Sequence, residues 1–313
     1  MKHQIVPYYF TFFLNKFMYT ILGATGNIGS RVTEALLAKG EKVRVIARSA
    51  DKLQAFATKG AEVLAGDAND TAFLTKAFTG SKAVLVMIST GFTTPDVPAA
   101  QNALGESITS AIKASGVKYV VNISSVGGHT EEKTGVIAGL ARQEQRLNAL
   151  DGVNVLHLRP SYFFENLLGN IGMIKGMGIN GSAIRGDQAF PLVATKDIAE
   201  VATKKLLALD FTGKSILPIL GAKDYSMNDV TKALGAAIGK PDLNYVTFPY
   251  DQARGAMVQG GLSESVADGY IVMSEGINTG VLNTEIRTAE STTPTTIEEF
   301  ATTIFAHVYN ARA

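Results

Sequence analysis

A glycine-rich turn between an apolar run and an amphipathic pattern constrains this 313-residue chain more than any other feature. Residues 19–22 form a short β-rich run, residues 23–29 read GATGNIG, and residues 28–39 repeat apolar side chains at helical spacing. This order predicts a strand, a tight turn at Gly23, and a helix whose first N–H groups are free to bind a phosphate. Gly26 would let the backbone approach that phosphate, and Gly29 would let the helix pack close to the strand. A purely structural turn is the alternative interpretation.

The same alternation continues through the first half of the chain. β-rich runs and helical stretches follow one another, which is typical of a parallel sheet covered on both faces. Right-handed crossovers then give the strand order 3-2-1-4-5-6 and place ligands at the carboxyl ends of the first and fourth strands. We therefore predict an α/β fold with a doubly wound parallel sheet of the Rossmann type. The predicted strands are 19–22, 43–47, 62–65, 83–88, 119–124 and 153–158, and the predicted helices are 28–39, 51–57, 72–78, 100–115 and 139–150.

The pattern loosens after residue 160. We expect an N-terminal extension over 1–17, a cofactor-binding Rossmann domain over 18–160, and a smaller, mainly helical substrate-side lobe over 161–313 that returns some strands to the core. The second half holds a glycine-rich stretch at 169–186, an apolar run at 190–194, a helix at 197–209, a strand at 215–220, and helical patterns at 227–238, 250–259, 263–274 and 297–308.

Composition argues against several classes of function. Basic and acidic residues nearly balance, 29 against 28, so nucleic acid is not expected as a partner. The chain has no cysteine, which fits a cytoplasmic location, and its four histidines show no metal-ligand spacing, so no metal site is expected. The apolar run at residues 5–13 is too short to span a membrane, and we favour an extension over an interfacial anchor.

The residues after the second predicted strand indicate which cofactor the turn would hold. NAD-binding proteins usually carry an acidic residue there, whereas this chain has Arg48 followed by Ser49. Arg48 can form a bidentate pair with a 2′-phosphate, which predicts NADP(H) as the cofactor. An arginine that is merely solvated, or neutralised by Asp51, is the alternative. The full set of predicted cofactor contacts is Gly23, Thr25, Gly26, Asn27, Ile28, Gly29, Arg48, Ser49, Lys52, Asp67, Ser89, Ser124 and Pro160.

One common catalytic pair is absent from the sequence. Short-chain dehydrogenases of this fold move a proton with a tyrosine and a lysine one helical turn later. None of the ten tyrosines has a lysine at that spacing. Reduction of alcohols or ketones by that route, and sugar-nucleotide epimerisation, are therefore disfavoured. Tyr162 is the hydroxyl nearest the expected nicotinamide end and is the single candidate for a catalytic residue.

From Met18 to its end the chain resembles the NmrA-like branch of the atypical short-chain dehydrogenases. The resemblance implies an NADP(H)-binding Rossmann domain, a small C-terminal lobe with a cleft between the two, and either hydride transfer to a flat acceptor or no robust turnover. Leu140 stands where many relatives have His or Lys, so no catalytic residue is transferred. The segments that carry the resemblance are residues 23–29, Arg48, Gly66-Asp67, Gly116-Val117-Lys118, Ser124-Ser125, Glu144 to Leu147, Leu158-Arg159-Pro160, Phe164-Glu165-Asn166, and Thr195-Lys196-Asp197-Ile198-Ala199.

Two functions are consistent with these residues. The first is an oxidoreductase that transfers a hydride from NADPH to a quinone-like or other conjugated small molecule, with positioning as the main source of catalysis. The alternative is an NADP(H)-binding redox sensor with little or no turnover that acts on a regulatory protein partner. The sequence identifies neither the acceptor nor the oligomeric state, for example a homodimer. Candidates for a flat, apolar acceptor pocket are Tyr162, Phe163, Phe164, Phe190 and Met87.

Overall fold

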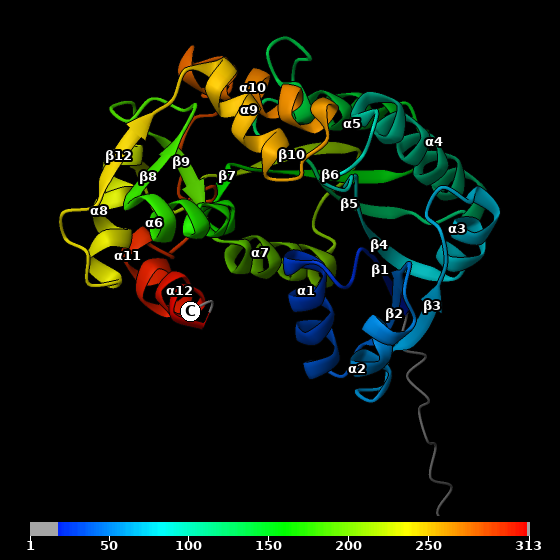
Figure 1. The fold of residues 1–313 in the computed structure, drawn as a ribbon. Coiled ribbons are helices and arrows are strands. Elements are labelled where there is room, and N and C mark those ends of the chain that lie inside the picture. The colour runs from blue at the N-terminus through cyan, green and yellow to red at the C-terminus, as the bar shows by residue number, and fades with distance from the viewer. Residues whose placement is uncertain (1–17, 312–313) are drawn as a thin grey trace, which may run out of the picture.

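A computed structural model describes residues 18–311, so the extension expected over residues 1–17 lies outside the described range. Its centre is a parallel sheet of seven strands in the order β10-β6-β5-β4-β1-β2-β3 (Figure 1). The predicted order of the first six strands is confirmed, and β10 extends the sheet beyond β6. The strands are β1 (Met18–Leu22), β2 (Lys42–Ala47), β3 (Glu62–Ala65), β4 (Ser81–Met87), β5 (Tyr119–Ile123), β6 (Asn154–Pro160) and β10 (Lys214–Ile219).

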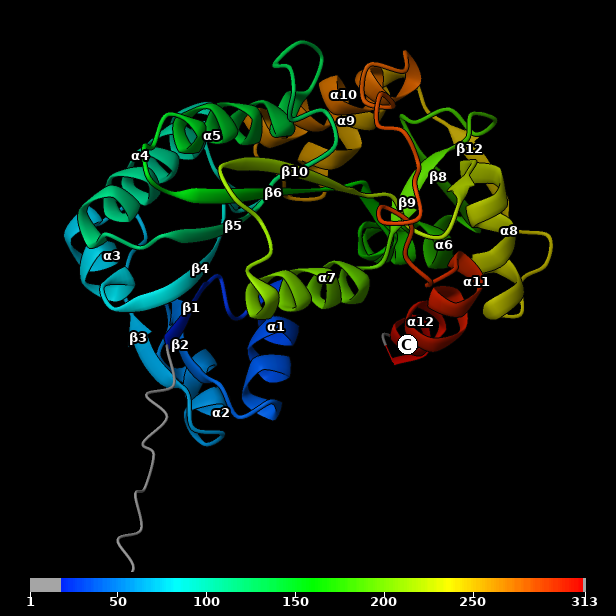
Figure 2. The same ribbon diagram turned by 180° about the vertical axis from the view of Figure 1, so that it is seen from behind.

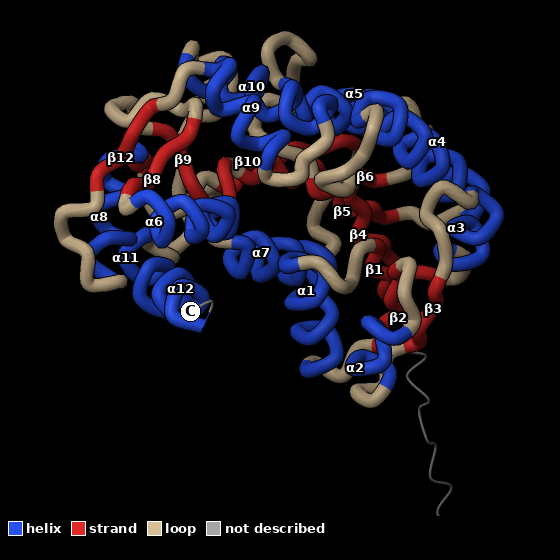
Figure 3. Tube along the Cα trace, in the orientation of Figure 1, coloured by secondary structure: helices blue, strands red, loops and turns tan. Residues whose placement is uncertain are grey.

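Helices cover both faces of this sheet, which explains why its strands are largely apolar. Neighbouring residues of one strand enter opposite cores: Ile21 packs into the core beneath α1 and α7, and Leu22 packs into the core beneath α3, α4 and α5. Figures 2 and 3 show the two helical layers with the strands between them. The helices are α1 (Asn27–Ala38), α2 (Gln54–Ala57), α3 (Thr71–Phe78), α4 (Val97–Ser115), α5 (Ala138–Asn148) and α7 (Thr195–Ala208).

Local capping sets where these helices begin and end. The Asp96 side chain accepts a hydrogen bond from the Ala99 N–H, and Pro98 lies in the first turn, where its missing N–H costs nothing. The helix predicted from residue 100 therefore starts at Val97. It ends where Gly116 takes a left-handed conformation with φ of 72°.

The rest of the chain forms a smaller lobe with its own apolar core. It is mainly helical, but it also contains a three-stranded sheet, β11-β9-β7, and a two-stranded sheet, β12-β8. The glycine-rich stretch at 169–186 contains α6 and β8. The elements are β7 (Tyr162–Phe163), α6 (Ile171–Met177), β8 (Ile179–Ser182), β9 (Phe190–Val193), β11 (Asp224–Tyr225), α8 (Met227–Ala237), β12 (Asn244–Thr247), α9 (Tyr250–Gln259), α10 (Glu264–Asn278), α11 (Ile297–Phe300) and α12 (Ala306–Ala311).

The chain passes between the two lobes more than once. After β9 it returns to the large sheet, where α7 packs beside α1 and β10 pairs with β6, before it enters the smaller lobe again at β11. Both α7 and β10 contribute side chains to the core of the large sheet, for example Ile198 and Ile219. Within residues 18–311, no helix combines the length and the apolar character needed to cross a membrane.

Candidate functional site: two cavities at one edge of the sheet

A first cavity of about 370 Å³ lies at the carboxyl ends of β1, β2, β3 and β4. Parallel strands of a doubly wound sheet bind ligands at this edge, where the strand order reverses between β1 and β4. The structure thus brings together residues from four separate loops. Six of the predicted cofactor contacts line this first cavity: Gly23, Thr25, Gly26, Arg48, Asp67 and Ser89.

The turn after β1 has the geometry of an anion site. Gly23 has φ of 76°, and the Gly26 N–H donates to the Gly23 carbonyl at 3.0 Å. Gly26 provides no side-chain cap, and the first turn of α1 contains no acidic residue that would repel a phosphate. The first N–H groups of α1 have no partner within the helix and form the positive end of its dipole. These features fit the pyrophosphate of a dinucleotide.

Arg48 extends this positive potential along the first cavity. Its side chain is exposed directly after β2 and, within the described part of the chain, forms no ion pair with Asp51 or any other residue. The structure therefore shows no ion pair through which Asp51 would neutralise Arg48. Asp67 accepts hydrogen bonds from the backbone and side-chain nitrogens of Asn69 at 2.9 and 3.0 Å, so it shapes a turn as well as lining the cavity.

The other predicted cofactor residues do not line the first cavity. Asn27, Ile28 and Gly29 form the first turn of α1, and Ser49 and Lys52 lie on the surface after Arg48. Ser124 is buried, and its hydroxyl donates to Glu144 Oε1 at 2.5 Å rather than facing a cavity. Pro160 is also buried, and its carbonyl accepts from the Val126 N–H at 3.0 Å.

The partner of Ser124 belongs to a buried ionic network. Glu144 is held by two hydrogen bonds from Arg159, at 2.9 and 2.7 Å, and Arg159 also pairs with Glu285 at 2.9 Å. The single guanidinium of Arg159 thus gives both carboxylates a charged partner. Leu140 stands where many relatives have His or Lys. It packs against the core of the smaller lobe and against the core beneath α3, α4 and α5, and its apolar side chain cannot replace a charged residue.

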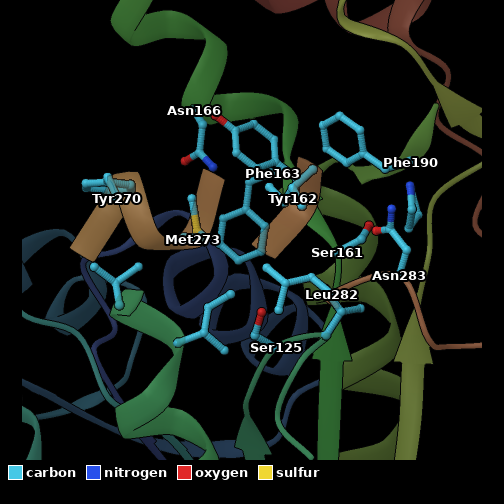
Figure 4. A pocket seen from close by; sticks show the side chains of 15 residues that line it. Ser125, Ser161, Tyr162, Phe163, Asn166, Phe190, Tyr270, Met273, Leu282 and Asn283 are labelled. Carbon is cyan, nitrogen blue, oxygen red and sulfur yellow. The ribbon is translucent and has the colours of Figure 1, made fainter. Parts of the chain in front are cut away.

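A second cavity, of about 190 Å³, opens at the ends of β5 and β6 (Figure 4). As predicted, Tyr162, Phe163 and Phe190 line it. Two predicted residues do not. Phe164 is fully buried in the smaller lobe, with its ring centroid 5.3 Å from that of Phe300, and Met87 lies beside Gly23 in the first cavity.

The other side of the second cavity comes from α10 and from the segment that follows it. Tyr270 and Met273 of α10 and Asn283 of the following segment line the cavity, and nothing in the sequence indicated any of the three (Figure 4). An amphipathic pattern indicates that α10 buries one face, but it does not indicate which distant element that face meets.

The second cavity contains no strong acid or base. No His, Lys, Arg, Asp or Glu lines it among the described residues. Tyr162 packs edge-on against Phe190, and burial raises the pKa of its phenol above the ordinary value. Tyr162 is therefore neutral and a weak proton donor. The described residues also contain no cluster of side chains that could hold a metal ion.

The two cavities lie at the ends of neighbouring strands. Met87 of β4 pairs in register with Ile123 of β5, so Ser89 and Ser125 occupy equivalent positions just beyond the strand ends. Neighbouring strands are separated by about 4.8 Å. Ser89 lines the first cavity and Ser125 lines the second, so a ligand that follows the edge of the sheet passes from one to the other.

Comparison with known proteins agrees with this architecture. The chain is 28% identical to an NAD(P)H azoreductase from Xenophilus azovorans over 271 residues, which cover 85% of this chain and 91% of the azoreductase. Its fold matches that of an Escherichia coli NADPH-dependent quinone oxidoreductase in complex with NADPH, with a TM-score of 0.78, 24% identity, and coverage of 92% and 100% of the two chains. It also matches NmrA, a negative transcriptional regulator, in complex with NADP, with a TM-score of 0.66, 15% identity, and coverage of 95% and 98%.

These matches confirm the predicted Rossmann-type fold. The model of the NmrA-like family matches residues 16–301, which include nearly all of the described chain and both cavities. The resemblance noted from the glycine-rich turn, Arg48 and the later segments is confirmed by this match, and the chain belongs to the NmrA-like family.

Proposed function

We propose that this protein is an NADPH-dependent oxidoreductase that reduces a flat, conjugated small molecule such as a quinone. The predicted cofactor, NADP(H), agrees with the names of similar proteins, an NAD(P)H azoreductase and an NADPH-dependent quinone oxidoreductase. The observation that carries the proposal is the position of the two cavities. A positively polarised cavity with a phosphate-type turn lies one strand away from an apolar cavity lined by aromatic rings.

Each part of the first cavity has a role in this proposal. The first N–H groups of α1 hold the pyrophosphate, and Gly26, which has no side chain, lets it come close to the backbone. The Arg48 guanidinium pairs with the 2′-phosphate that distinguishes NADPH from NADH. NADPH, when bound, supplies a hydride to the acceptor. Residues of the second cavity orient that acceptor and exclude water from it.

The neutral lining of the second cavity favours an acceptor that needs no strong acid. A quinone accepts a hydride and takes its proton from water afterwards, so the weakly acidic Tyr162 does not prevent the reaction. Flat aromatic compounds also match the apolar walls formed by Phe163, Met273 and Leu282.

The cofactor assignment is tested by comparing NADPH and NADH binding to the wild type and to Arg48→Ala. The wild type should prefer NADPH, and the variant should lose about 10- to 100-fold in NADPH affinity with little change for NADH, because a charge-assisted pair is lost. Arg185→Ala is a suitable control because Arg185 is an exposed arginine of the other lobe, and among residues 18–311 its side chain forms an ion pair with Asp187 alone. Equal losses for both nucleotides, or none, would contradict the role of Arg48.

The reaction is tested by adding 1,4-naphthoquinone to the NADPH-loaded protein and following the absorbance of NADPH. Oxidation above the protein-free rate supports the reductase. A second function, an NADP(H)-binding sensor, is favoured by one observation, the absence of an acid or base among the described residues that line the second cavity. Tight NADPH binding without oxidation by a panel of quinones and azo dyes would favour that sensor.

A further inference from the structure

Two polar side chains without partners lie at one end of the second cavity. The Ser161 side chain is 3% exposed, and its buried Oγ has no hydrogen-bond partner. Within the part of the chain that the structure describes, the side-chain amide of Asn283 also has no partner. Figure 4 shows both side chains at the same end of the cavity, on the side away from Tyr270.

The backbone holds both residues in place. The Ser161 N–H donates to the Ile219 carbonyl of β10 at 3.0 Å, which fixes Ser161 at the end of β6. The Asn283 N–H donates to the Gly280 carbonyl at 3.1 Å. The side chain of Leu282, the residue before Asn283, packs closely on Gly127. A Cβ at position 127 would lie 2.4 Å from Leu282 Cδ2.

A buried ion pair joins the two segments. Arg159 lies two residues before Ser161, and Glu285 lies two residues after Asn283, and the pair is 2.9 Å long. Their side chains are only 7% and 18% exposed, so solvent screens the pair weakly. This ion pair holds the end of β6 beside the segment that follows α10, and both segments contribute a residue to the lining of the second cavity.

An unpartnered hydroxyl inside a protein is costly, and native structures rarely leave one unless a ligand or water completes it. The Ser161 hydroxyl and the Asn283 amide can both donate hydrogen bonds. Two donors at one end of an apolar cavity can bind a single oxygen atom of a ligand. A carbonyl oxygen at the edge of a flat acceptor would accept hydrogen bonds from both donors.

We propose that Ser161 Oγ–H and Asn283 Nδ2–H donate hydrogen bonds to a carbonyl oxygen of the acceptor and stabilise the negative charge that develops there. This inference rests on the proposed function. When the hydride and its electron pair form a C–H bond at a carbon conjugated to the carbonyl, the displaced π electrons move onto the oxygen. Water then protonates that oxygen. Fixed donors at this position act as an oxyanion hole, and the substrate class is a carbonyl-conjugated compound such as a quinone or an enone.

The first test measures equilibrium binding and does not depend on turnover. The NADP⁺-loaded protein is titrated with 1,4-naphthoquinone and with naphthalene, which has the same rings but no oxygen. The chain has no cysteine, so the quinone cannot form thioether adducts during the titration. Ser161→Ala should weaken naphthoquinone binding about 2- to 10-fold and leave naphthalene binding unchanged.

Ser107→Ala is the matched control. Ser107 is as buried as Ser161, but its hydroxyl accepts a hydrogen bond from Thr71 at 3.2 Å and lies between α3 and α4, far from the cavity. This control should keep wild-type binding of both compounds and should unfold at a lower temperature, because it leaves Thr71 without its acceptor. Ser161→Ala should unfold at the wild-type temperature or above, because it removes an unpartnered group.

The second test uses the quinone reaction. Ser161→Ala and Asn283→Asp should each lower kcat/KM for naphthoquinone by about 10- to 100-fold, with Asn283→Asp the slower because its carboxylate repels the developing charge. If the wild type oxidises no NADPH, the proposed function fails, but the binding test still decides this inference. Three results would each overturn the proposed role of Ser161 and Asn283. They are an equal effect of Ser161→Ala on the binding of naphthoquinone and naphthalene, no measurable binding of naphthoquinone by the wild type, and a lower unfolding temperature for Ser161→Ala.

Discussion

At the scale of single residues, Gly29 is fixed by the turn that precedes it. A Cβ at this position would lie 2.3 Å from the Gly23 carbonyl oxygen, which belongs to the backbone and cannot rotate away. We expect Gly29→Ala to push α1 away from β1, to cost roughly 1–3 kcal/mol of unfolding free energy, and to weaken NADPH binding. Denaturant unfolding with and without NADPH measures both effects.

Gly172→Ala is the comparison for this prediction. Gly172 lies in α6, and a Cβ there would meet no atom within 4 Å. Alanine should therefore be neutral or stabilise the protein by up to about 1 kcal/mol through its helix propensity. If both variants behaved alike, the close approach of α1 to the turn would not be what fixes Gly29.

At the scale of elements, the sequence predicts what is encoded locally. The order of β1 to β6 follows from apolar runs and from the handedness of crossovers. Tyr162 is found because it follows β6 at the ligand edge, and Phe190 because it begins the apolar run at 190–194. Contacts between distant segments have no such local pattern. The sequence therefore did not show that α10 and Asn283 close the second cavity, nor that Glu285 pairs with Arg159.

Strand β6 contains a histidine, His157, which pairs with Asn122 of β5 and makes the free energy of unfolding depend on pH. His157 is buried, with Asn122 Nδ2 at 3.1 Å from its Nδ1 and Asn148 Oδ1 at 2.9 Å from its Nε2. These contacts suit a neutral ring with its proton on Nε2. Burial lowers the pKa of His157 from 6.5 to about 4.

The sign of the effect follows from this lowered pKa. Between pH 6.5 and about 4 the unfolded chain binds a proton on His157 that the folded chain does not, so stability falls as the pH falls through this window. The loss is expected to reach up to about 3 kcal/mol, measured as the free energy of unfolding in urea. His157→Gln should flatten this slope, while His129→Gln, at an exposed position, should leave it unchanged. Parallel slopes for the wild type and His157→Gln would show that another group causes the pH dependence.

At the scale of the whole molecule, the two lobes are joined by the path of the chain. The segment after residue 160 supplies β10 to one edge of the large sheet and α7 to one of its faces. Buried side chains of α7 such as Ile198 and Leu206 each contribute about 2 kcal/mol to that core. The Arg159–Glu285 ion pair adds a further tie from the sheet to the segment after α10. We therefore propose that the regions 18–160 and 161–313 are structural lobes that cannot fold independently.

Site-specific fluorescence tests this cooperativity, because the chain contains no tryptophan and each introduced one reports on a single place. Tyr119→Trp reports on the large sheet, where Tyr119 packs against Phe211, and Tyr309→Trp reports on the smaller lobe, where Tyr309 packs against Phe305. Because the lobes share elements, we expect a single unfolding transition in urea. For each variant, the midpoint measured by fluorescence should equal the midpoint measured by circular dichroism. The m-values of the two variants should also be equal. Separate midpoints, with the smaller lobe unfolding at a lower urea concentration than the sheet, would show that α7 and β10 do not couple the lobes. The acceptor cavity could then open while the nucleotide-binding side stays folded.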